Sequence, residues 1–155
     1  MEAPPAAVLA RRGNGNRNGH KKGPVRMKEA RVFAAQPTVL SEVRRFIQEQ
    51  AKSASLPADA AGDLVIAASE AAANSALYSN SAEFEVGWDR QDHRVEVVVS
   101  DRGVFRRKLP LAEDEEDPGR GRGIQLMVAL MDEVDVRHGT PHEPGTLVRL
   151  VKYLR

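Results

Sequence analysis

The feature that most constrains the fold is an alanine-rich stretch from Asp59 to Tyr78, which reads DAAGDLVIAASEAAANSALY. Its length and its helical spacing of apolar residues predict one long helix. The expected apolar positions are Leu64, Ala67, Ala68, Ala71 and Leu77. Because most of these side chains are small, the helix backbone can lie close to a neighbouring layer. The stretch therefore predicts a helix packed tightly on a sheet.

Strands are predicted on both sides of this helix. Two alternating, β-branched runs follow it, EFEVGWD from Glu83 and RVEVVVSD from Arg94, separated by a polar turn at residues 90–93. EVDVRH and GTLVRLVKYL give two closing strands around a turn at residues 139–145. Before the helix, MKEARVFAA predicts an edge strand that begins near Met27. The strands favour a meandering, antiparallel arrangement.

Two more helices are predicted, one on either side of the central pair of strands. An apolar stripe at helical spacing marks the first: Leu40, Val43, Ile47 and Ala51. Thr38 or Ser41 is expected to cap its N-terminus. IQLMVALM, residues 124–131, predicts a short apolar helix. The resulting order of elements predicts an α+β fold, a two-layer α/β sandwich with helices on one face of a mixed, mostly antiparallel sheet.

The charge of the chain is unevenly distributed. Its 155 residues suit one domain, but residues 1–31 carry eight Lys or Arg against two acidic residues, and the remainder has 15 basic and 20 acidic residues. GNGNRNGHKKGP, residues 13–24, has almost no apolar surface to offset the entropy lost on ordering. We therefore predict a disordered basic arm at residues 1–26 and a folded domain at residues 27–155. The arm could contact nucleic acid or fold back on the acidic domain, and its charge is compatible with both.

Composition excludes several classes of protein and site. The chain has no cysteine, so a disulfide framework, a thiolate metal site and a cysteine nucleophile are excluded. No stretch approaches the roughly 18 consecutive apolar residues of a membrane span, and the first 30 residues lack the apolar core of a signal peptide. We expect a cytoplasmic protein without membrane contact. No hydrolase nucleophile is expected at Ser69, Ser75, Ser79 or Ser81, because these serines lack the strand-to-helix glycine elbow that would expose one.

Three polar residues stand out among apolar neighbours. Glu70 and Asn74 are four residues apart, so both project from one face of the alanine-rich helix. They either need partners that offset desolvation or simply face water. Asp101 directly follows a run of valines, and Gly103 after it permits close backbone approach. Asp101 could accept a hydrogen bond from an exocyclic amine, or the string Asp-Arg-Gly could be an ordinary turn.

Three glycines precede the short apolar helix: Gly119, Gly121 and Gly123. They place free backbone N–H groups at a helix N-terminus, where anions bind, and Arg120 and Arg122 add positive charge. Phosphate is the expected ligand. A flexible nucleic-acid segment is the alternative, but the acidic run at residues 113–117 would repel a polyanion.

Taken in order, these motifs resemble those of the GHKL, or Bergerat-fold, ATPases. More narrowly, they resemble the anti-sigma factor serine/threonine protein kinases of bacterial sporulation and stress response. SEAAANSALYS resembles the N box, SDRGVF the first glycine box, GRGIQLMVALMDEVDV the second glycine box with its helix and strand, and GTLVRLVKYL the C-terminal strand. The likeness spans residues 29–155.

The resemblance implies ATP and Mg²⁺ as ligands and assigns roles within the site. Asn74 would hold Mg²⁺, and Glu70 would be the catalytic base that takes a proton from the attacking hydroxyl. Asp101 would accept the adenine amino group, and Thr146 would support the adenine pocket. Residues 106–120 would form a lid. The remaining nucleotide-binding positions would be Gly103, Gly119, Arg120, Gly121, Arg122, Gly123 and Ile124.

The function that the resemblance implies is that of an anti-sigma factor and protein serine kinase. Such a protein sequesters a bacterial sigma factor and phosphorylates an anti-anti-sigma protein of the STAS type, and it works as a homodimer without direct nucleic acid binding. The alternative is an anti-sigma, nucleotide-binding interaction module without kinase activity. A sensor histidine kinase would need a helical hairpin with a phosphoacceptor histidine upstream, where only His20 lies, within a glycine-rich coil.

Overall fold

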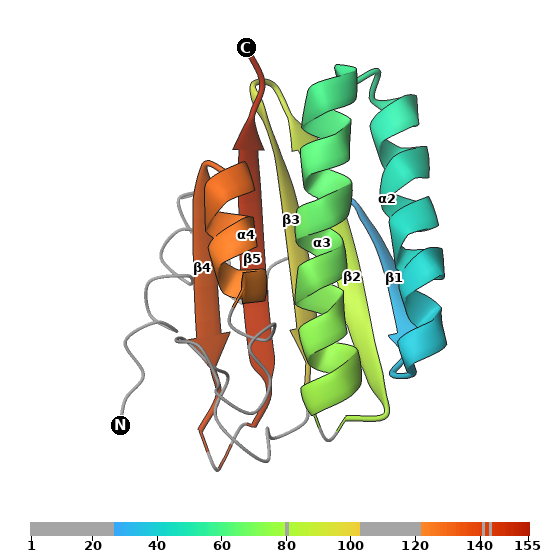
Figure 1. Ribbon diagram of the computed structural model, residues 1–155, viewed down its shortest axis with the longest axis vertical. Coiled ribbons are helices and arrows are strands. Elements are labelled where there is room, and N and C mark those ends of the chain that lie inside the picture. Colours follow the sequence, from blue (N-terminus) through green and yellow to red (C-terminus); the bar gives the residue numbers. More distant parts are fainter. Residues whose placement is uncertain (1–26, 80, 103–121, 141, 143) are drawn as a thin grey trace.

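The protein has two layers, with helices on one face of a sheet (Figure 1). The computed structural model describes residues 27–79, 81–102, 122–140, 142 and 144–155. The helices are η1 (Pro37–Val39, a 3₁₀ turn), α2 (Leu40–Ser53), α3 (Ala58–Tyr78) and α4 (Arg122–Leu130). The strands are β1 (Glu29–Ala34), β2 (Glu83–Gln91), β3 (Arg94–Asp101), β4 (Glu133–His138) and β5 (Thr146–Tyr153). The predicted α+β sandwich is confirmed.

The described strands form one sheet in the order β1-β2-β3-β5-β4. All four pairings between them are antiparallel, so the sheet of the described residues is fully antiparallel rather than mixed. β1 lies at an edge of the sheet, as the alternating run MKEARVFAA predicted. The last strand, β5, lies between β3 and β4, so the C-terminal segment is inserted inside the sheet next to the edge strand β4.

The core lies between α3 and the sheet. Leu64, Ala67, Ala68 and Ala71 are fully buried, as predicted, because their small or well-fitted side chains let α3 pack closely on the central strands. Leu77 is the exception, since 48% of its surface is exposed. It lies seven residues after Glu70, which is about two helical turns, so it lies on the side of α3 that carries Glu70 and not on the core face.

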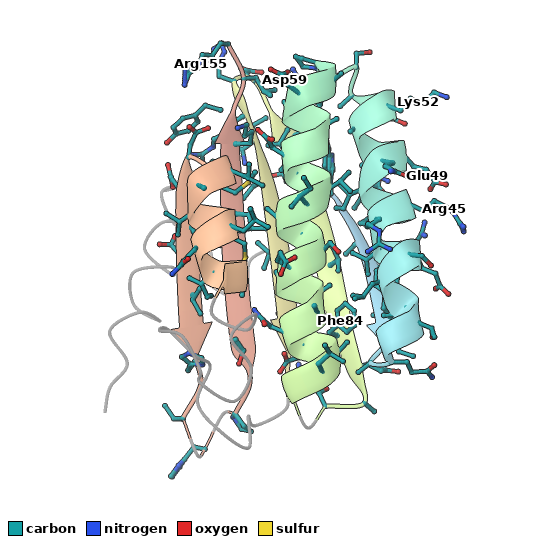
Figure 2. All side chains as sticks on the ribbon, viewed as in Figure 1. Arg45, Glu49, Lys52, Asp59, Phe84 and Arg155 are labelled. Carbon is teal, nitrogen blue, oxygen red and sulfur yellow. The ribbon has the colours of Figure 1, made fainter. Side chains whose placement is uncertain are left out.

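Helix α2 buries one stripe and exposes the other. Its buried residues are Val43, Phe46, Ile47 and Ala51. Arg45, Glu49 and Lys52 project to the solvent side of the helix, while Phe84 lies under the helical layer (Figure 2). The predicted helix cap was wrong: the N-cap residue is Val39 and makes no side-chain capping bond. The chain enters α2 through η1, so Thr38 is used inside that 3₁₀ turn and Ser41 already lies inside the helix.

Among the described residues, no helix combines the length and the apolar character that a bilayer span requires. The predicted arm at residues 1–26 and the predicted lid at residues 106–120 lie outside the described residues, as do Gly103, Gly119, Arg120 and Gly121.

Candidate functional site

The carboxylate of Asp101 is held at the junction of helix and sheet. Asp101 ends β3 on the face that carries the helices, and it is 8% exposed. The hydroxyl of Ser75 donates to its Oδ2 at 2.8 Å, and the hydroxyl of Ser79 donates to its Oδ1 at 3.1 Å. Hydrogen bonds to a charged acceptor are stronger than neutral ones, so the two serines fix the orientation of the carboxylate. The result is a rigid acceptor beneath the last turns of α3.

Thr146 lies beside this carboxylate on the neighbouring strand. It is the register partner of Asp101 in the β3–β5 pairing, and it is 6% exposed. Its Oγ1 is buried and has no hydrogen-bond partner among the described residues. Such an unpaired buried hydroxyl costs about 1–3 kcal/mol. A buried carboxylate next to an unsatisfied hydroxyl is the arrangement expected of a site that awaits a polar ligand.

A glycine brings these two residues together. Gly145 precedes Thr146 and has a φ of +134°, a conformation that L side chains rarely adopt. A Cβ there would overlap the carbonyl oxygen of Asp101 and lie 3.1 Å from the Cα of Arg102. Only glycine therefore lets β5 begin so close to the end of β3.

Glu70 and Asn74 lie on the side of α3 that faces α4. Both are half-buried. A Cβ added at Gly123, in the first turn of α4, would lie 2.9 Å from Oε1 of Glu70. The missing side chain at Gly123 thus leaves the room that the Glu70 carboxylate uses. The fold brings Glu70 on α3 and Gly123 in the first turn of α4 into contact.

Two further predicted nucleotide-binding residues, Arg122 and Ile124, lie on α4. Arg122 is the first residue of α4. Ile124 is partly buried and packs against the hydrophobic core, so its side chain supports the helix.

Sequence reasoning missed Ser75 and Ser79, which it had examined only as nucleophiles. Their spacing was the available signal, because residues four apart on a helix share a face. That face lies against the end of β3, where the carboxylate of Asp101 accepts a hydrogen bond from each serine.

Comparison with known proteins places the chain in a family and finds solved structures with a similar fold. A family model described as histidine kinase-like ATPase domain matches residues 33–152. No curated protein matches the chain.

Two similar solved structures are 18% and 15% identical to the chain, which makes them evidence for the fold alone. One is the crystal structure of the RsbU and RsbW domains of Rv1364c from Mycobacterium tuberculosis, with a TM-score of 0.59 over 83% of this chain and 33% of that one. The present chain thus spans about a third of that relative. The other is the SiaB–SiaC complex from Pseudomonas aeruginosa, with a TM-score of 0.59 over 94% of this chain and 97% of that one.

Proposed function

Because the chain belongs to the histidine kinase-like ATPase domain family, we propose that it binds ATP with Mg²⁺ and acts as an anti-sigma factor and protein serine kinase. It sequesters a bacterial sigma factor and phosphorylates an anti-anti-sigma protein of the STAS type. The order of the N box and the two glycine boxes supports this proposal. So do the names of the similar structures, one of which contains an RsbW domain and the other a SiaB–SiaC complex.

The observation that carries the nucleotide proposal is the buried pair Asp101 and Thr146. Their side chains offer a charged acceptor next to a hydroxyl that lacks a partner among the described residues. The edge of adenine presents an amino donor beside a ring nitrogen acceptor, which matches this pair. Guanine presents a carbonyl oxygen instead of the amino group, and an ionised carboxylate would repel it. The pocket therefore suits ATP better than GTP.

The phosphate end of the proposed site uses α3 and α4. Mg²⁺ prefers oxygen ligands, so the carboxamide oxygen of Asn74 would hold the ion, and the bound ion would supply positive charge next to the phosphate oxygens. The serine hydroxyl oxygen of the protein substrate forms a bond to the γ-phosphorus while the bond to the β,γ-bridging oxygen breaks. ADP leaves with that electron pair, and the carboxylate of Glu70 accepts the hydroxyl proton. Gly123 gives Glu70 the space to turn toward that proton.

Calorimetric titration tests the nucleotide site first. Wild-type protein should bind ATP in the presence of Mg²⁺ and bind GTP at least about a hundredfold more weakly, because a wrongly paired buried polar group costs about 3 kcal/mol. Asn74→Ala should lose the Mg²⁺ dependence. Ser69→Ala is the matched control, since Ser69 lies on the same helix but accepts from Arg44 on α2. Equal binding of ATP and GTP would contradict the assignment of Asp101.

Phosphotransfer tests the catalytic step separately. Labelled phosphate from γ-labelled ATP should pass to a purified STAS-domain protein. Glu70→Gln should keep ATP binding while lowering the transfer rate about 10²- to 10⁴-fold, the usual contribution of a general base. ATP binding without transfer to any STAS protein would favour the non-kinase interaction module. The resemblance extends the proposal to a homodimer, which light scattering of the purified protein measures directly.

A further inference from the structure

The face of the sheet opposite the helices contains a buried cation. Arg149 on β5 is 3% exposed and lies between Val148 and Leu150, which belong to the core, so its side chain projects from the outer face. Its guanidinium donates to Glu96, to Oε1 of Glu133 at 3.1 Å and to Oδ2 of Asp135 at 2.9 Å. Burial disfavours its charge, but attraction to Glu96 and hydrogen bonds to all three carboxylates outweigh burial and raise the pKa of Arg149.

The outer face carries more acid than base. Strand register places six carboxylates and three arginines there: Glu83, Glu85, Asp89, Glu96, Glu133 and Asp135 with Arg94, Arg137 and Arg149. The excess of negative charge attracts a basic segment. Val98 and Val151 on this face are 7% and 0% exposed, although the described helices all lie on the other side. The face therefore combines negative charge with buried apolar side chains.

The chain reaches β1 from this same face. Gly87 lies between Val86 and Trp88 of the core, so a side chain at Gly87 would project outward. A Cβ there would lie 2.8 Å from the Cβ of Met27, because Met27 occupies that space. Met27, the first described residue of this segment, thus lies on the outer face against β2.

We propose that the N-terminal arm, residues 1–26, docks across the outer face of the sheet as an intramolecular basic ligand. The arm has six basic residues and one acidic residue: Arg11, Arg12, Arg17, Lys21, Lys22, Arg26 and Glu2. Its cationic ends contact the excess carboxylates of this face. Nothing about ATP or a protein substrate enters this proposal.

The distances allow such docking. From β2 to β4 the sheet order β2-β3-β5-β4 spans three strand spacings, or roughly 14 Å at about 4.8 Å each. The chain from Lys22 to Met27 reaches about 17 Å when extended. Lys21 and Lys22 can therefore reach any strand from β2 to β4. Because the arm is covalently attached, its effective concentration is on the order of millimolar, and weak ion pairs suffice to hold it.

Carbodiimide cross-linking of the full chain tests the proposal, because this reagent joins a lysine amine directly to a carboxylate in contact with it. Lys21 and Lys22 should link to carboxylates of the outer face, and the links should weaken as salt is added. The variant Glu85→Gln with Asp89→Asn should lose these links several-fold. Neither residue binds Arg149, so the fold should persist, and thermal unfolding checks this. Glu42→Gln with Glu49→Gln on the exposed side of α2 removes the same charge and should change nothing.

Three results would overturn the proposal. Equal links to Glu42 or Glu49 and to the sheet carboxylates would mean that the arm has no preferred surface. Links only between isotope-labelled and unlabelled chains in a mixture would mean that the face joins two copies. Absence of links to the sheet, with the two lysines protected from reagent when duplex DNA is added, would assign the arm to nucleic acid.

Discussion

Ser75 on α3 donates a 2.8 Å hydrogen bond to Oδ2 of Asp101 at the end of β3, so one hydroxyl joins the helical layer to the candidate adenine pocket. Its neighbour one turn later, Ser79, donates to the other oxygen at 3.1 Å. The orientation of the proposed base-binding carboxylate therefore depends on helix residues that need not touch the nucleotide themselves.

Ser75→Ala should weaken ATP binding about ten- to a hundredfold, because a hydrogen bond to a charged group contributes about 1.5–3 kcal/mol. Ser79→Ala should have a smaller effect, since its bond is longer and only part-buried. Calorimetry with ATP measures both, and Ser69→Ala again serves as the control. Wild-type affinity in Ser75→Ala would show that Asp101 is positioned without the serine.

Gly123→Ala should disturb Glu70 directly, because the added Cβ would lie 2.9 Å from Oε1 of the carboxylate. The side chain of Glu70 must turn away, so phosphotransfer should fall at least about tenfold while the melting temperature changes little. Gly62→Ala is the matched control: it lies in α3 with no atom within 4 Å of the new Cβ. That variant should gain about 0.5–1 kcal/mol of stability from helix propensity and keep its activity. Unchanged transfer in Gly123→Ala would separate Glu70 from the reaction.

Gly145→Ala should lower the free energy of unfolding by at least about 1–3 kcal/mol, the cost of the strained backbone conformation alone. The backbone there has a φ of +134°, and the new Cβ would also overlap the carbonyl oxygen of Asp101. Urea unfolding measures the loss, and ATP binding should decline with it because Thr146 moves away from Asp101. A stability equal to that of wild type would mean that the start of β5 can shift freely.

Arg149→Met should destabilise the protein by about 3–5 kcal/mol, since it leaves three carboxylates without their buried cation. Denaturant unfolding compares the variant with Arg45→Met, which removes an exposed cation from α2. Similar small effects of both substitutions would mean that the buried cluster adds little stability.

Ionisation of Tyr153 should lower the free energy of unfolding at alkaline pH. Its phenol donates to Glu133, and this hydrogen bond raises the pKa of Tyr153, with a smaller contribution from desolvation of the phenolic oxygen. The folded pKa exceeds the unfolded value of about 10, so the stabilisation is complete below pH 10 and is lost as the pH rises through the folded value. Melting temperatures of wild type and Tyr153→Phe should therefore converge at high pH. Phenolate absorbance that titrates at or below the ordinary value would contradict the bond to Glu133.

The sequence predicted the elements well because their patterns are local. The alanine-rich helix and the alternating runs at β2 and β3 have strong periods, and their residues lie where the periods put them. The start of α2 was not predictable, since a 3₁₀ turn replaced the expected side-chain cap. Leu77 was wrongly predicted to be in the core. An alanine-rich helix has small apolar residues on several sides, so the sequence does not show which side of its last turn faces the sheet.

The site was predictable in part. Glu70, Asn74, Asp101 and Thr146 were identified from motifs, and the fold puts Asp101 directly across from Thr146. The contacts of Ser75 and Ser79 with Asp101 join residues 26 and 22 positions apart, and no local period encodes them. The ion-pair cluster around Arg149 could not be predicted from the sequence either. Its carboxylates lie on β3 and β4, and these strands come next to Arg149 only when β5 pairs with both of them in the folded sheet.

The packing of Met27 over Gly87 has a consequence for how this sequence can diverge. The two positions share a single volume, because a Cβ at Gly87 would overlap the Met27 side chain. A side chain introduced at Gly87 meets a clash with the Cβ of Met27 itself, so a shorter residue at position 27 relieves it only if that residue is glycine or the backbone there shifts. Across a set of homologous chains, a side chain at position 87 should therefore occur only where position 27 is glycine or where the backbone before β1 takes another path.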